Sequence, residues 1–136
     1  RAVIVEQYIK GRELTVGVMD GKAMPVIEII PKAGFYDYKN KYQAGLTTEL
    51  CPAPIGDEAT AQIQRISEAV NEALMLQAYC RVDFLMNDKG EFFCLEANTL
   101  PGMTPTSLIP QMAAAQGKNF GELCEQIIEV SLKKYR

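Results

Sequence analysis

Residues 79–98 read YCRVDFLMNDKGEFFCLEAN, and the alternation of apolar and polar side chains in this stretch predicts a β-hairpin. The two strands are expected over 79–86 and 91–97, with the connection at 87–90. Successive side chains of a strand point to opposite faces, so one face of the hairpin should be apolar and the other polar. The apolar face would carry Val82, Phe84, Phe93, Leu95 and Ala97, and the polar face Arg81, Asp83, Cys94, Glu96 and Asn98.

The register of this hairpin decides which polar side chains meet. A register set by a tight turn over 87–90 places Asp83 opposite Cys94. The same register places Arg81 opposite Glu96, and a one-residue bulge would change both pairs. Carboxylate and amide oxygens are the hard ligands that Mg²⁺ takes together with water and phosphate oxygens. The polar face is therefore a candidate Mg²⁺ site, and the alternative is a solvated face that carries an Arg–carboxylate ion pair.

Three more strands are expected upstream, over 2–9, 12–19 and 22–30. The Asp-Gly pair at 20–21 is a strong signal for a two-residue hairpin turn. Pro25 cannot donate a backbone hydrogen bond, so it indicates an edge strand or a bulge. Strands joined by such tight turns are typical of an antiparallel meander.

Helices are expected over 57–77, 106–116 and 120–134, where apolar residues recur at helical spacing. Residues 31–55 show no period and are expected to form a long loop with an aromatic and basic cluster. The expected caps are Asp57 for the first helix, Gly117 after the second, and Asn119 with Glu122 for the third. These elements together predict an α+β domain with a mostly antiparallel sheet and helices packed on one face.

Composition excludes several classes of protein. The chain has 136 residues, of which 48% are apolar and 23% are charged, and its net charge is −3. This suits one domain and argues against a general nucleic-acid or anionic-membrane binder, and no apolar run reaches the ~20 residues of a membrane span. The chain has no histidine, which excludes Ser-His-Asp and Cys-His catalysis and His-ligated zinc. Its four cysteines are scattered along the sequence and are expected to be free thiols.

Three further places could carry chemistry. The backbone amides at Gly102 and at the start of the next helix could hold a developing anion, or this could be a plain turn. Glu6 and Glu13 could accept from an amino group or a ribose hydroxyl, or be surface acids. Lys41 and Tyr42 could reach and cover a phosphate, or lie in a solvated loop.

Five segments resemble the C-terminal part of the D-alanine–D-alanine ligases, which are ATP-grasp enzymes: VEQYIKGRELTVGV, GFYDYKNKY, TTELCPAP, CRVDFL and LEANTLPGMTPTSLIPQ. The LEANTLPGMTPTSL run is very specific, whereas RVDF followed by LEAN is shared more widely among ATP-grasp proteins. The resemblance implies that residues 1–136 are an ATP-grasp C-terminal domain. Residues 1–10 would then be the strand and hinge from the preceding subdomain. Because the chain starts in an apolar strand without an initiator Met, we expect it to be cut from a longer protein.

The resemblance also implies roles for individual residues. For ATP, it implies Glu6 on the adenine amino group, the backbone of Gln7, Tyr8 and Ile9 on the adenine edge, and Glu13 on the ribose. For metal, it implies Asp83, Glu96 and Asn98 as ligands of two Mg²⁺ ions, for which Mn²⁺ can substitute. For catalysis, it implies Arg81 and Gly102 on the acyl-phosphate, and Lys41 and Tyr42 in a loop that closes over the γ-phosphate. Ser107 and Leu108 would bind the carboxylate of the second D-alanine.

The activity that the resemblance implies is ATP-dependent joining of two D-alanines through an acyl-phosphate, for peptidoglycan precursors and the cell wall. Partners would be small molecules, with neither nucleic acid nor membrane, and the full-length protein would be a cytoplasmic homodimer. The chain alone is expected to be inactive, because the family's glycine-rich phosphate loop and the pocket for the first D-alanine lie in a part that it lacks. The alternatives are a D-alanine–D-lactate or D-alanine–D-serine ligase, and a non-catalytic ATP-grasp-like nucleotide-binding module.

Overall fold

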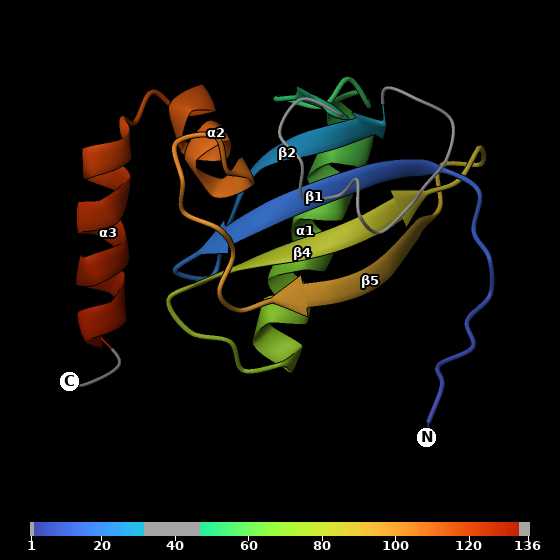
Figure 1. Cartoon of the computed structure of the whole chain (residues 1–136), viewed down its shortest axis with the longest axis horizontal. Helices are drawn as coiled ribbons and strands as arrows, with labels where there is room; N and C mark the ends of the chain where they lie inside the picture. Colours follow the sequence, from blue (N-terminus) through green and yellow to red (C-terminus); the bar gives the residue numbers. More distant parts are fainter. Residues whose placement is uncertain (1, 32–46, 134–136) are drawn as a thin grey trace.

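The computed structural model describes residues 2–31 and 47–133, and within them a five-stranded antiparallel sheet is packed with three helices (Figure 1). The strand order across the sheet is β3-β2-β1-β4-β5. The strands are β1 (Arg12–Met19), β2 (Lys22–Pro31), β3 (Thr47–Leu50), β4 (Tyr79–Met86) and β5 (Phe92–Asn98), and the helices are α1 (Asp57–Ala73), α2 (Leu108–Ala115) and α3 (Phe120–Lys133). The predicted α+β class is confirmed. None of these helices, within the described ranges, is both long and apolar enough to cross a membrane.

The hairpin of β1 and β2 follows the prediction closely. Asp20 and Gly21 have φ angles of 52° and 72°, the two positive values that a tight hairpin turn of this kind requires. The register of the pair shifts between Val16 and Val18 of β1. The stretch of β2 opposite this shift includes Pro25, so the bulge predicted there is confirmed.

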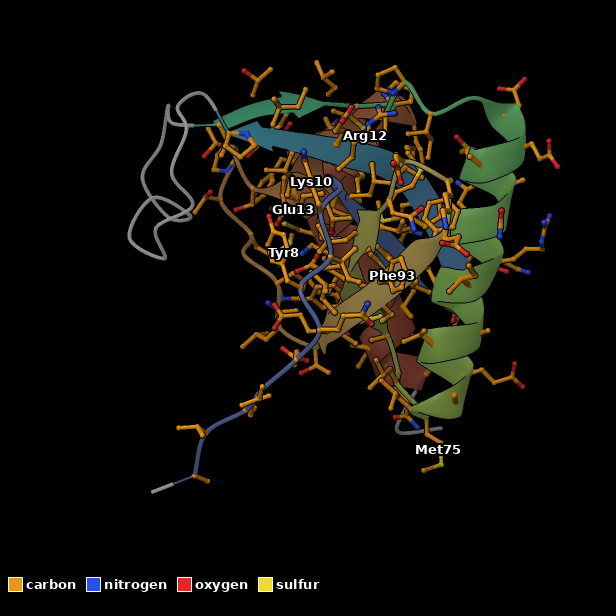
Figure 2. All side chains as sticks on the ribbon, turned by 90° about the vertical axis from the view of Figure 1, so that its right-hand side faces the viewer. Tyr8, Lys10, Arg12, Glu13, Met75 and Phe93 are labelled. Atoms are coloured by element: carbon orange, nitrogen blue, oxygen red, sulfur yellow. The ribbon has the colours of Figure 1, made fainter. Side chains whose placement is uncertain are left out.

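Two parts of the predicted strand pattern are wrong. Residues 2–9 form no strand, and the side chains of Val3, Ile4 and Val5 are 85%, 88% and 90% exposed. A strand needs a neighbour for its backbone hydrogen bonds, and this segment runs away from the sheet in both views (Figures 1 and 2). Conversely, Thr47–Leu50 forms β3 inside the predicted loop, because β2 offers it a free edge. The meander therefore consists of β1, β2 and β3.

Helix α1 covers one face of the sheet, where Ile63 is fully buried. The helix is preceded by Gly56, which has φ of 82°, and no side chain caps it. The predicted cap at Asp57 is therefore wrong, since Asp57 is already the first helical residue. The helix ends at Ala73 rather than at residue 77, because Met75 adopts φ of 53°, which a right-handed helix excludes. The side chains buried with α1 include Leu14, Val16, Val18, Val26, Val82 and Phe84.

Helix α2 packs on the opposite face, mainly against β2, and it also comes close to β1 at Gly17. A Cβ atom on Gly17 would lie 2.6 Å from Ile109 Cδ1, 2.8 Å from Met24 Sδ and 3.0 Å from Met112 Sδ, closer than packed atoms come. Glycine therefore lets α2 lie directly on the sheet. Helix α3 adds Leu123 to the same cluster of buried side chains. The expectation that all helices pack on one face is therefore wrong. Helix α1 covers one face of the sheet, and α2 with α3 form a second core on the other.

The ends of α2 and α3 carry the predicted caps. Gly117 has φ of 80°, and the N–H of Lys118 donates to the carbonyl oxygen of Ala113 at 3.0 Å, which closes α2. At the start of α3, the N–H of Glu122 donates to Asn119 Oδ1 at 3.0 Å and the N–H of Asn119 donates to Glu122 Oε2 at 2.8 Å. This is the predicted capping box. Local sequence signals therefore mark where α2 ends and where α3 begins.

Candidate functional site

The hairpin of β4 and β5 carries the predicted polar face, but with a different register. Asp83 pairs with Glu96, and Arg81 pairs with Asn98. The predicted pairs of Asp83 with Cys94 and of Arg81 with Glu96 are therefore wrong. The register shifts next to Asp83, because β5 carries one extra residue there. Residues directly opposite in an antiparallel pair share a face, so the two carboxylates still lie side by side on one face.

The same bulge changes the apolar side of β5. Cys94 pairs with Phe84, Leu95 is 49% exposed, and Phe92 rather than Phe93 packs against the core under α1. The prediction of Phe93 and Leu95 as core residues is wrong, since one extra residue reverses the faces on either side of it. Burial and the negative charge of Asp83 both raise the pKa of the Cys94 thiol. Cys94 is therefore a protonated thiol near neutral pH rather than a reactive thiolate.

Asp83 is held by three hydrogen bonds on this face. Its carboxylate is buried, and Arg81 donates to it twice, from Nε to Oδ1 and from Nη2 to Oδ2, both at 2.9 Å. Thr15 of β1, which lies directly opposite Asp83, donates from Oγ1 to Oδ1 at 2.6 Å. A buried carboxylate needs such partners, because burying an unpaired charge is costly. The carboxylate of Asp83 is thus fixed in place before any ligand arrives.

Glu96 and Asn98 are the more accessible members of the face. Glu96 is exposed and Asn98 is half-buried, with its Oδ1 accepting the N–H of Leu100 at 3.0 Å. Directly opposed residues of an antiparallel pair have Cβ atoms about 4.5–5.5 Å apart, so the carboxylates of Asp83 and Glu96 can reach one cation. Two carboxylates and an amide oxygen fit the oxygen ligands that Mg²⁺ takes. In the described part of the chain no three Asp, Glu, Cys or His side chains form a metal cluster, so Asn98 with phosphate or water oxygens would complete the shell.

The segment between β5 and α2 is folded by its own hydroxyl groups. Ser107 Oγ accepts the backbone N–H of Thr104 at 3.0 Å and lies 2.8 Å from Thr104 Oγ1. A Cβ atom on Gly102 would lie 3.0 Å from Ser107 Oγ, so glycine allows the two turns of this segment to come together. Leu108 is the first residue of α2. Gly102, predicted to bind the acyl-phosphate, and Ser107 with Leu108, predicted to bind the second D-alanine, therefore belong to one short structural unit.

The residues predicted for ATP lie in two different surroundings. Glu13 is buried on β1, beside Thr15 in sequence and on the same face of the sheet. By contrast, Glu6, Gln7 and Tyr8 are exposed, and Figure 2 shows Tyr8 on the segment that leads away from the sheet. Ile9, in the same segment, is half-buried. The structure brings Glu13 to the polar face and leaves the predicted adenine residues outside it.

Two predicted residues, Lys41 and Tyr42, lie outside the described residues. One residue of the site was missed by the sequence prediction, namely Thr15. The signal that could have found it is the alternation of β1, in which Glu13, Thr15 and Gly17 share a face. That signal becomes useful only once β1 is known to lie beside β4.

Comparison with known proteins gives matches over nearly the whole chain. The family described as D-ala D-ala ligase C-terminus matches residues 1–129. The D-alanine--D-alanine ligase of Methylacidiphilum infernorum is 48% identical over 134 residues, which are 98% of this chain and 44% of that relative.

Solved structures give the same picture. The D-alanine--D-alanine ligase from Bacillus anthracis complexed with ATP has a TM-score of 0.80 and 41% identity, over 94% of this chain and 42% of that chain. The VanG D-Ala:D-Ser ligase from Enterococcus faecalis has a TM-score of 0.76 and 29% identity, over 91% of this chain and 37% of that chain. The chain therefore spans less than half the length of each of these relatives.

Proposed function

Because the chain belongs to the D-alanine–D-alanine ligase C-terminal family, we propose that the complete protein joins two D-alanines at the expense of ATP. The product, D-alanyl-D-alanine, would serve peptidoglycan precursor synthesis and so the cell wall. The structural observation that best supports this proposal is the pairing of Asp83 with Glu96 on one face of the β4–β5 hairpin. This face offers oxygen ligands where a nucleotide's phosphates need a cation.

The proposed reaction has two steps. The carboxylate of the first D-alanine attacks the γ-phosphorus of ATP, which forms an acyl-phosphate and releases ADP. The amine of the second D-alanine then attacks the acyl carbon, a proton leaves the nitrogen, and phosphate departs. Neither step needs a protein nucleophile, which agrees with a chain that contains no histidine. Catalysis then depends on positioning and on neutralising the phosphate charge.

The residues of this chain are assigned roles within that reaction. Asp83, Glu96 and Asn98 would hold two Mg²⁺ ions, for which Mn²⁺ could substitute. When bound, the metal neutralises phosphate charge and polarises the phosphoryl oxygens. Arg81 and the Gly102 amide would bind the acyl-phosphate, while Ser107 and Leu108 at the start of α2 would bind the carboxylate of the second D-alanine. Glu13, with Glu6, Gln7, Tyr8 and Ile9, would bind the nucleoside of ATP, and Lys41 with Tyr42 would cover its phosphate.

This nucleoside site would require residues 2–10 to take a different position in the complete protein. Their apolar side chains, such as Val3, Ile4 and Val5, are almost fully exposed here. We propose that these residues connect the domain to the preceding subdomain. There they would complete the nucleotide site, whereas the pocket for the first D-alanine would lie in a part of the complete protein outside this chain. The complete protein is further proposed to be a cytoplasmic homodimer whose partners are small molecules.

The choice of acceptor separates the proposal from its nearest rival, a ligase that joins D-alanine to D-serine or D-lactate. Two relatives more than 40% identical to this chain, at 48% and 41%, are named D-alanine--D-alanine ligase, whereas the D-Ala:D-Ser ligase structure is 29% identical. This difference supports D-alanine as the acceptor. A non-catalytic nucleotide-binding module is less well supported, because the charged side chains proposed for catalysis, Asp83, Arg81 and Glu96, are all present on one face.

The test is an ADP-release assay on the complete protein with ATP and Mg²⁺. We expect D-alanine alone to support turnover, with D-alanyl-D-alanine as the product by mass spectrometry. Turnover that appears only when D-serine or D-lactate is added would assign the rival activity. ATP binding without turnover under any of these conditions would assign the binding module.

A further inference from the structure

Thr15 is a partner of Asp83 to which the proposed function gives no role. It is fully buried in β1 and is the cross-strand partner of Asp83. Its Oγ1 lies 2.6 Å from Asp83 Oδ1 and 3.4 Å from the carbonyl oxygen of Val82. A hydroxyl has one proton to donate, and the shorter contact to a charged oxygen takes it. The hydroxyl is therefore committed to one oxygen of the carboxylate.

The hydrogen bonds to Asp83 are distributed unequally between its two oxygens. An ionised carboxylate has about four lone-pair positions, two on each oxygen. Oδ1 accepts from both Thr15 and Arg81, whereas Oδ2 accepts from Arg81 only. With respect to the described residues, Oδ1 is saturated and Oδ2 retains one position. A cation that approaches this carboxylate would meet Oδ2.

We propose that Thr15 is a positioning residue of the ligase site: its hydroxyl occupies Asp83 Oδ1 and leaves Oδ2 as the single oxygen that binds the divalent cation. This inference rests on the proposed function, because it requires Asp83 to be a ligand. A hydrogen bond of this kind fixes the orientation of a ligating carboxylate, and losing it typically weakens metal binding about 10–100-fold. Asp83 would then bind the cation through one oxygen, and its cross-strand partner Glu96 would supply a second carboxylate.

The identity of the residue supports this assignment over a purely structural role. Valine has the same shape as threonine, is favoured in strands, and fills the neighbouring positions Val16 and Val18. A fully buried hydroxyl is costly unless it forms a hydrogen bond. Asp83 already has a bidentate partner in Arg81, so an ion pair alone would not require a hydroxyl at this position. The hydroxyl adds a constraint on one chosen oxygen.

The experiment measures Mn²⁺ binding to the complete protein by electron paramagnetic resonance, without turnover. Thr15→Val should bind Mn²⁺ about 10–100-fold more weakly, and Thr15→Ser, which keeps the hydroxyl, should stay within about threefold of the wild type. Thr48→Val on β3 is the matched control, because Thr48 pairs with Ile30 and is far along the sheet from β4. It should bind Mn²⁺ as the wild type does. Thr15→Val with wild-type affinity overturns the inference.

A crystal structure of the wild-type protein with Mn²⁺ tests the same inference even if Thr15→Val does not fold. The metal should bond to the oxygen of Asp83 that does not accept from Thr15. Bonding to the other oxygen, or to both, overturns the inference and leaves the proposed function intact. A wild-type protein that binds Mn²⁺ no better than Asp83→Asn overturns the metal site itself, and the role of Thr15 with it.

Discussion

Replacing Gly17 by alanine should loosen α2 and disturb Ser107 and Leu108, the proposed acceptor residues. The new Cβ would lie 2.6 Å from Ile109 Cδ1 and 3.0 Å from Met112 Sδ. Carbon atoms pack best at about 3.5–4.0 Å, so the contact with Ile109 is short by roughly 1 Å. Both neighbours are fully buried, which leaves them little room to turn aside. Overpacking of this kind costs about 1–3 kcal/mol, and we expect a loss of about 2 kcal/mol in the free energy of unfolding.

Urea unfolding of the wild type and the variant measures this loss. Gly117→Ala is the control at the far end of the same helix, because a Cβ atom there meets nothing within 4 Å while φ is 80°. It should lose about 1–2 kcal/mol through backbone strain alone. In the complete protein, Gly17→Ala should raise the KM for the acceptor D-alanine through movement of Ser107 and Leu108, whereas Gly117→Ala should not. A Gly17→Ala variant with unchanged stability would refute the close packing of α2 on the sheet.

Three further predictions follow from particular contacts. Burial raises the pKa of the Cys80 thiol to about 11, so between about pH 9 and that value the unfolded thiol loses its proton while the folded one keeps it. The free energy of unfolding should therefore fall as the pH rises through this window, and the fall should be smaller in Cys80→Ala. Urea unfolding at several pH values measures it, and the same pH dependence in both proteins would contradict this. Arg12→Met should cost about 1–3 kcal/mol, since it leaves the buried Glu28 without its bidentate partner, whereas Lys89→Met in the β4–β5 turn should change stability by less than about 0.5 kcal/mol. Residues 1–136 alone should release ADP with D-alanine at least about 10³-fold more slowly than the complete protein. The pocket proposed to hold the first D-alanine lies outside this chain, and positioning of the reactants lowers such a barrier by up to ~7–11 kcal/mol. A rate within tenfold of the complete protein would refute this.

Local patterns predicted the elements that depend on local chemistry. Strands β1 and β4 were predicted with the bounds that the structure shows, because alternating side chains and the Asp20-Gly21 turn mark them. The capping box of Asn119 and Glu122 was equally readable, since its partners lie three residues apart. Such signals act within a few residues and need no knowledge of the rest of the fold.

The errors concern features that depend on distant neighbours. The strand expected over 2–9 has a suitable sequence but no strand beside it, and β3 became a strand only because β2 offers an edge. The bulge in β5 is set by how β4 and β5 fit against the core, so the alternation of side chains did not reveal it. The polar face survived this error because the new pairing of Asp83 with Glu96 preserves their common face.

The site was predicted as a set of residue types rather than as a network. Arg81, Asp83, Glu96 and Asn98 could be grouped from strand alternation, and the family resemblance gave them roles. Thr15 could not be added, because it reaches Asp83 through the pairing of β1 with β4, which are separated by α1 in the sequence.

The most direct test of the proposed metal-binding face is the Mg²⁺ dependence of ADP release by the complete protein when Glu96 is changed to glutamine. Glu96→Gln should keep the fold and lower kcat at least about 100-fold, because a proposed ligating carboxylate on the β4–β5 face is lost. Glu91→Gln, the same change at an exposed position in the adjoining turn, should leave kcat within about twofold of the wild type. A Glu96→Gln variant that turns over at close to the wild-type rate at ordinary Mg²⁺ concentrations would contradict the assignment of this face as the ligase site.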